Sequence, residues 1–137
     1  MTTTVLLAVG DAVEASRSVG RIVDRAGRWP DCQVVVLHVH QTVHGALFSY
    51  VLDQEAPGEC LAEIVARTLA AQGIAARPLI VERPEGGVPA AIADVARQVG
   101  AAVVLVGAVP GWCRPELATA AQVGRLLPTT ATLQTIT

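Results

Sequence analysis

Five short strand-like runs alternate with four stretches of helical spacing, and this alternation constrains the fold more than any other feature of the chain. Strands and helices in alternation build βαβ units, whose strands pair in parallel and whose helices cover the sheet. Most of the runs are nearly continuous in apolar residues, as expected of strands that are buried on both faces. The sequence therefore predicts an α/β domain with a parallel sheet, its strands at residues 4–10, 32–39, 76–83, 102–107 and 130–136.

The first helical stretch shows its spacing most clearly. Val19, Ile22, Val23 and Ala26 recur at intervals of three and four residues, which places them on one face of a helix. Glycine and proline mark the helix ends. The segment 41–58 is polar and is the longest and least predictable connection. We expect helices at 12–27, from Pro57 to Gly73, from the turn at Gly86, Gly87 and Pro89 to Gly100, and near 116–127.

The length of 137 residues fits one domain, which we place over residues 1–137. Hydrophobic residues make up 52% of the chain, but no apolar run approaches the roughly 20 residues of a membrane span. The start of the chain lacks the basic segment of a signal peptide, so we expect a cytoplasmic protein with no membrane partner. The ten basic residues, all arginine, are scattered and the formal net charge is −2, so we expect no nucleic-acid partner.

Residues that carry catalysis or bind metals are few. The chain has no lysine for a phosphate loop or a Schiff base, and no serine lies in a nucleophile elbow. His38, His40 and His44 share one face of a strand, but no carboxylate or cysteine nearby completes a metal site. We therefore assign no catalytic residue and no metal ligand, and we favour a non-enzymatic role.

The three cysteines, Cys32, Cys60 and Cys113, are far apart and predict reduced thiols rather than a disulfide or a zinc site. Cys113 lies beside Arg114 in a loop near a helix start, where a stabilised thiolate would make it a redox sensor. A semi-buried, unreactive thiol is the simpler interpretation.

Three segments carry a resemblance to a known family: residues 32–40, 87–92 and 100–107. The first, CQVVVLHVH, is similar to the second strand of universal stress proteins, which commonly ends Leu-His-Val. The second, GVPAAI, resembles the Gly-x-Pro turn that opens the family's third helix, and the third, GAAVVLVG, resembles its fourth strand. The segments occur at the family's usual spacing, and the match extends over essentially the whole chain.

The resemblance implies a three-layer α/β/α fold of the adenine nucleotide alpha hydrolase type, with five parallel strands in the order 3-2-1-4-5. Ligands of such sheets bind beyond the carboxyl ends of the strands, where the strand order reverses. Here that place is the crevice between the first and fourth strands. A nucleotide bound there would contact Asp11, Val39, Gly107 and Gly111, although Asp11 fits a helix N-cap as well.

The loop after the fourth strand departs from the family's phosphate-binding pattern. Nucleotide-binding members have Gly, two residues, Gly, nine residues, then Gly with Ser or Thr, so that backbone N–H groups and a hydroxyl contact the phosphates. Here Gly107 is followed by Pro110, which has no N–H to donate, and Gly111 comes one place late. No Gly-Ser or Gly-Thr pair follows, and Trp112 adds bulk.

Two functions follow from these observations. We expect a binding or signalling module of this family that holds no cofactor and does not bind ATP in the family manner. The alternative is an adenine-nucleotide-binding member that takes ATP or AMP and has weak ATPase activity.

The fifth strand, 130–136, alternates polar and apolar residues, unlike the other strands, and this is typical of a sheet edge. An edge strand offers unpaired backbone groups to another chain. We therefore expect a homodimer that forms through this C-terminal edge strand, with a small molecule in the crevice as the other partner.

Overall fold

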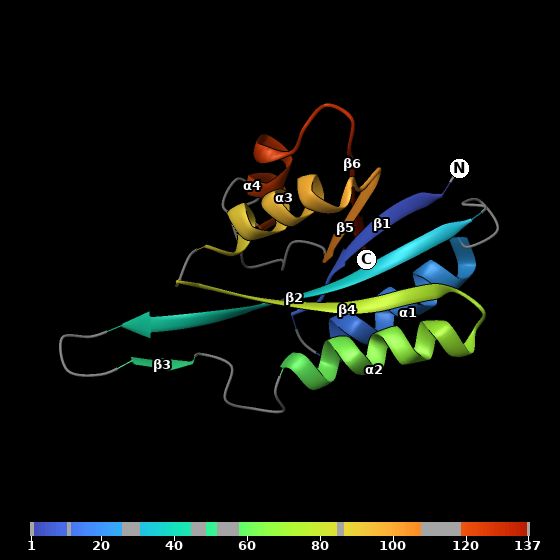
Figure 1. Cartoon of the computed structure of the whole chain (residues 1–137), viewed down its shortest axis with the longest axis horizontal. Coiled ribbons are helices and arrows are strands. Elements are labelled where there is room, and N and C mark those ends of the chain that lie inside the picture. The colour runs from blue at the N-terminus through green and yellow to red at the C-terminus, as the bar shows by residue number, and fades with distance from the viewer. Residues whose placement is uncertain are drawn as a thin grey trace.

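Five parallel strands form the sheet at the centre of the computed structural model, which describes residues 2–10, 12–25, 31–44, 49–51, 58–84, 87–107 and 119–136 (Figure 1). β1 pairs with β2 and β5, β2 pairs with β4, and β5 pairs with β6, all in parallel. Counted along the chain, the parallel strands stand in the order 3-2-1-4-5, which confirms the predicted fold. Their bounds are β1 Thr3–Ala8, β2 Cys32–His44, β4 Ala75–Pro84, β5 Val103–Gly107 and β6 Thr132–Ile136.

A sixth, short strand lies in segment 41–58, which the sequence marked as the longest and least predictable connection. β2 extends five residues beyond the predicted end at residue 39, and β3 (Ser49–Val51) pairs antiparallel with its final residues, Thr42 opposite Val51. β4 supports the longer β2 by pairing with it as far as Thr42. The strands that are buried on both faces are apolar at nearly every position. The extension of β2, residues 40–44, mixes polar residues with β-branched ones, so it did not show this pattern in the sequence. In Figure 1 the end of β2 and β3 project beyond the helices.

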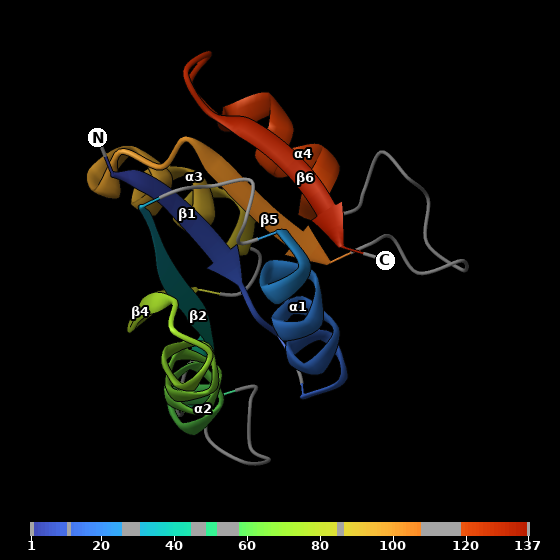
Figure 2. The same ribbon diagram turned by 90° about the vertical axis from the view of Figure 1, so that its right-hand side faces the viewer.

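Two pairs of helices cover the two faces of the sheet, and Figure 2 shows the layers from the side. α1 and α2 lie on one face and α3 and α4 on the other, as the two buried clusters record. None of the described helices has the length and apolar character needed to cross a membrane. The helix bounds are α1 Ala12–Arg25, α2 Gly58–Ala71, α3 Val88–Val99 and α4 Thr119–Leu126.

The core consists of two apolar layers, and β1 contributes to both of them. Val5, Leu7 and Val9 point to the side of α1 and α2, while Leu6 and Ala8 point to the side of α3 and α4. Side chains alternate between the faces of a strand, so a strand that is covered twice must be apolar at every position. Burial of each large aliphatic side chain contributes roughly 1.5–3 kcal/mol.

The ends of α3 are fixed by glycine and proline, as the sequence predicts. The N–H of Gly87 donates to the carbonyl of Pro84 at 3.0 Å, and Pro89 stands in the first helical turn. At the other end Gly100 adopts φ 64° and donates its N–H to the carbonyls of Ala96 and Arg97. This left-handed cap returns the chain to the sheet directly before β5.

Two glycine-to-alanine substitutions should change stability in opposite directions. Gly100→Ala places a Cβ in left-handed backbone and should lower the free energy of unfolding by about 1 kcal/mol. Gly20→Ala, in α1, meets nothing within 4 Å, and it should raise that free energy by about 0.5–1 kcal/mol because alanine favours the helix. Urea unfolding followed by circular dichroism measures both changes. Shifts of the same sign would contradict the assigned backbone conformations.

Candidate functional site

The candidate site is the crevice expected at the carboxyl end of β1, where the pairing of the strand with both of its neighbours ends. The pairing of β1 with β5 ends at Leu7 opposite Leu105, and the pairing with β2 ends at Ala8 opposite Leu37. α1 follows β1 on one face of the sheet, whereas α4 follows β5 on the other. Chain segments that leave neighbouring strands toward opposite faces make a topological switch point, the usual ligand site of such sheets.

Two of the four predicted site residues are described, and both lie at this crevice. If the strand register is continued by two residues, Gly107 stands beside Val9 and Val39 beside Gly10. Val39 and Gly107 therefore flank the end of β1, two strand spacings or about 10 Å apart. The Val39 side chain is buried and Gly107 is half-buried. Asp11 and Gly111, like the rest of the loop at 108–118, lie outside the described residues.

The backbone of Val39 faces the crevice. The N–H of Val9 donates to the carbonyl of Leu37 at 2.9 Å, so the polar groups of Leu37 point toward β1. Alternate residues of a strand direct their N–H and C=O to the same side. Val39 therefore presents one donor and one acceptor along the edge that β1 no longer covers.

His38 is a site residue that the sequence analysis assigned only to a strand end. It is 3% exposed and is the one polar side chain that is buried within the described part of the chain. Its Nδ1 lies 3.0 Å from the carbonyl oxygen of Val9, the last residue before Gly10. A carbonyl oxygen only accepts, so Nδ1 carries the proton and donates. The signal in the sequence was a histidine inside an otherwise apolar run.

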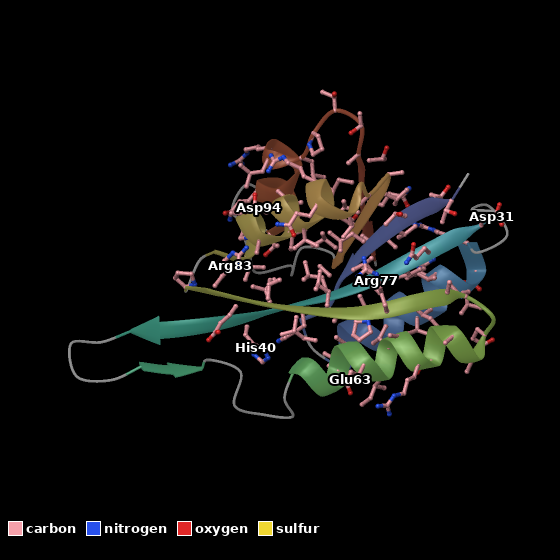
Figure 3. The ribbon with its side chains drawn as sticks, in the orientation of Figure 1. Asp31, His40, Glu63, Arg77, Arg83 and Asp94 are labelled. Atoms are coloured by element: carbon pink, nitrogen blue, oxygen red, sulfur yellow. The ribbon has the colours of Figure 1, made fainter. Side chains whose placement is uncertain are left out.

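His40 contacts His38 on the same face of β2. Their ring centroids are 4.9 Å apart and the ring planes are nearly perpendicular, at 87°. Figure 3 shows His40 on the side of the sheet that α2 covers, while Arg83 lies on the side of α3. No three His, Cys, Asp or Glu side chains in the described ranges come together closely enough to hold a metal ion. The structure describes the backbone of His44 but not its side chain.

Cys32 is the first residue of β2. It therefore lies at the amino ends of the strands, whereas the crevice lies at their carboxyl ends. It is a free, half-buried cysteine. Burial raises the pKa of its thiol because desolvation disfavours the thiolate. Cys32 therefore remains protonated and weakly nucleophilic at neutral pH. Cys113, the cysteine with the redox interpretation, lies outside the described residues.

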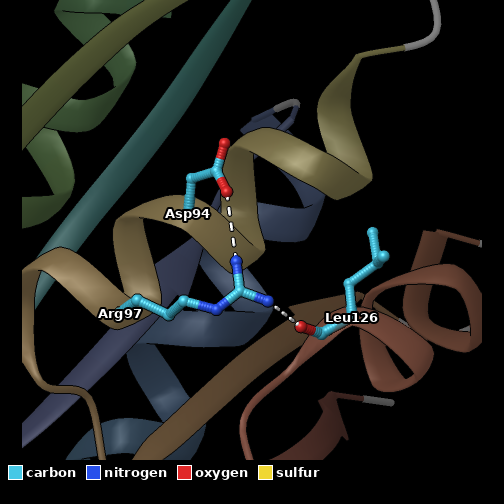
Figure 4. A network of polar contacts seen from close by, with 3 residues as sticks. All are labelled: Asp94, Arg97 and Leu126. Carbon is cyan, nitrogen blue, oxygen red and sulfur yellow. Dashed lines mark hydrogen bonds and ion pairs between the residues drawn. The ribbon is translucent and has the colours of Figure 1, made fainter.

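α4 is held at its carboxyl end by Arg97 of α3. Nη2 of Arg97 donates to the carbonyl of Leu126, the last residue of α4, and Nη1 contacts Asp94 Oδ1 at 3.2 Å (Figure 4). A guanidinium beside the final carbonyls of a helix satisfies an orphan acceptor and complements the helix dipole.

Comparison with solved structures finds the same fold in universal stress proteins. One from Burkholderia pseudomallei is 16% identical with a TM-score of 0.69, covering 98% of this chain and 95% of that one. One from Archaeoglobus fulgidus, in complex with dAMP, is 16% identical with a TM-score of 0.65, covering 100% and 98%. One from Arabidopsis thaliana, with AMP bound, is 16% identical with a TM-score of 0.66, covering 98% and 90%.

Sequence comparison identifies the family directly. No curated protein gave a significant match to the chain. The sequence profile of the universal stress protein family, however, matches residues 1–119. That range includes every parallel strand except β6. The chain therefore belongs to the universal stress protein family.

Proposed function

We propose that this chain is a binding and signalling module of the universal stress protein family that does not hold ATP in the way the family's nucleotide-binding members do. The observation that carries the proposal is Pro110, which stands where those members have the second glycine of the phosphate loop. Proline donates no N–H and its φ is fixed, so it cannot present backbone to a phosphate as glycine does.

The start of α4 supports the same proposal. Counted nine residues on from Pro110, the Gly-Ser pair of the family pattern would fall on Ala120 and Ala121. α4 begins at Thr119, so these two residues stand in its first turn, where a bound phosphate would meet N–H groups and the positive end of the dipole. Alanine brings no hydroxyl to this position and, unlike glycine, carries a Cβ.

Calorimetric titration with ATP and Mg²⁺ tests this proposal on two proteins, the wild-type chain and a variant that restores the family pattern. We expect no low-micromolar binding by the wild-type chain. The triple variant Pro110→Gly, Ala120→Gly, Ala121→Ser restores the pattern and should gain at least tenfold in ATP affinity, the worth of one or two charge-assisted hydrogen bonds.

The matched control makes the same alanine changes far from the crevice. Ala70→Gly, Ala71→Ser alters two exposed residues in the last turn of α2, so it costs similar helix stability without touching the loop. It should leave ATP binding unchanged. Low-micromolar ATP binding by the wild-type chain would overturn the proposal.

Adenine-nucleotide binding with weak ATPase activity is the second candidate, and the backbone of Val39 favours it. One donor beside one acceptor matches the edge of an adenine ring, and universal stress proteins of the same fold were solved with AMP and dAMP. Asp11, Val39, Gly107 and Gly111 would form that site. AMP binding by the wild-type chain, with phosphate release from ATP, would favour this candidate over the first.

A homodimer through β6 is the assembly that the two sheet edges favour. The outer strand β4 carries two prolines, Pro78 and Pro84, and the charged residues Arg77, Glu82 and Arg83. Proline and charge are the usual protection of an edge against pairing. β6 has neither within its five residues, so its edge is the better template for a second copy.

One added charge on each edge strand tests this dimer. Thr135 of β6 and Ala75 of β4 are both exposed. Thr135→Arg should shift the protein from dimer to monomer in sedimentation velocity, because a charged edge opposes pairing. Ala75→Arg should sediment as the wild-type protein does. A monomeric wild-type protein, or equal behaviour of the two variants, would refute pairing through β6.

A further inference from the structure

We infer that His38 is a positioning residue for the crevice. Its ring holds the carbonyl of Val9 and thereby sets the course of the chain as β1 leaves the sheet, beside the backbone of Val39. The ligand part of this inference rests on a small molecule binding in the crevice, as the second candidate function requires. The hydrogen bond itself does not.

The bond stands where the strand ladder would otherwise continue. In a parallel ladder the N–H of Val39 would donate to the carbonyl of Val9, after Val9 has donated to Leu37. The pairing of β1 with β2 instead ends at Ala8 opposite Leu37, and Nδ1 of His38 reaches the Val9 carbonyl at 3.0 Å.

The His38 ring stands on the face of the sheet that carries Val34 and Val36, toward α1 and α2. The Val9 carbonyl must therefore turn out of the sheet plane to meet the ring. This turn ends the ladder and leaves the polar edge of Val39 directed at the crevice.

Burial explains why the position is sensitive. A polar ring that is 3% exposed is tolerated only with a hydrogen bond, since an unsatisfied buried polar group costs about 1–3 kcal/mol. The perpendicular contact with His40 restricts the rotation of the His38 ring, so Nδ1 keeps facing Val9. Because burial and the His40 contact restrain the His38 ring, the Val9 carbonyl takes the position that the ring requires.

The tautomer of His38 is the first test, and it needs only the wild-type protein. Long-range ¹H–¹⁵N spectra distinguish a neutral ring protonated on Nδ1 from one protonated on Nε2. We expect Nδ1–H for His38, because the carbonyl of Val9 accepts from that atom. A ring protonated only on Nε2 would overturn the inference whatever the protein binds.

A pair of substitutions tests the positioning role. His38→Asn keeps an N–H donor close to the place of Nδ1, whereas His38→Leu fills similar volume without a donor. In His38→Leu we expect the amide resonance of Gly10 to shift and AMP affinity to fall about tenfold, the effect of one lost buried hydrogen bond. His38→Asn should stay within about threefold of the wild-type affinity.

The outcomes separate this inference from the proposed function. Wild-type protein that binds no AMP would remove the nucleotide candidate, while the tautomer and the amide shifts would still decide the role of His38. A His38→Leu protein that unfolds earlier but keeps the wild-type Gly10 resonance and AMP affinity would show that His38 is a core residue only, and would overturn the inference. If His38→Leu does not fold, the tautomer and the His38→Asn spectra decide it.

Discussion

The structure depends on the pairing of β1 with a parallel neighbour on each side. β1 contributes alternate side chains to both apolar layers, so its burial joins the two helical layers into one core. The same pairing places the ends of β2 and β5 on either side of it. When β1 leaves the sheet before those neighbours end, a crevice follows from the topology alone. The location of the site is thus a consequence of the fold, and His38 acts on the course of the chain within it.

The parallel sheet was predictable because strands that are buried on both faces have a simple sequence pattern. A strand covered on both faces is apolar throughout, and glycine and proline marked helix ends such as the one at Gly100. The extension of β2 and the strand β3 have no such pattern. They lie beyond the helical layers, and the pairing there depends on β4, a partner distant in sequence.

The candidate site was predictable in position and less so in content. Family resemblance and topology led to Val39 and Gly107, and both stand at the end of β1. His38 was assigned only to a strand end, because a periodicity argument treats a buried position as apolar and cannot show which carbonyl a polar ring would meet. That partner is 29 residues away along the chain. Tertiary hydrogen bonds of this kind follow from register, which one sequence does not display.

The β2 side of the crevice and the side after β5 depend on different structural features, so a substitution can alter one side without the other. The half formed by β2 offers backbone groups whose direction is set by strand register, so substitutions of exposed side chains leave it intact. The half after β5 would require glycine conformations and a hydroxyl at a helix start, which single substitutions remove. Pro110 removes a donor from the second half only. If the crevice binds a nucleotide, as the second candidate function proposes, such a chain loses contacts to phosphates more readily than contacts of the Val39 backbone to a base, so contacts to a base need not imply contacts to a triphosphate.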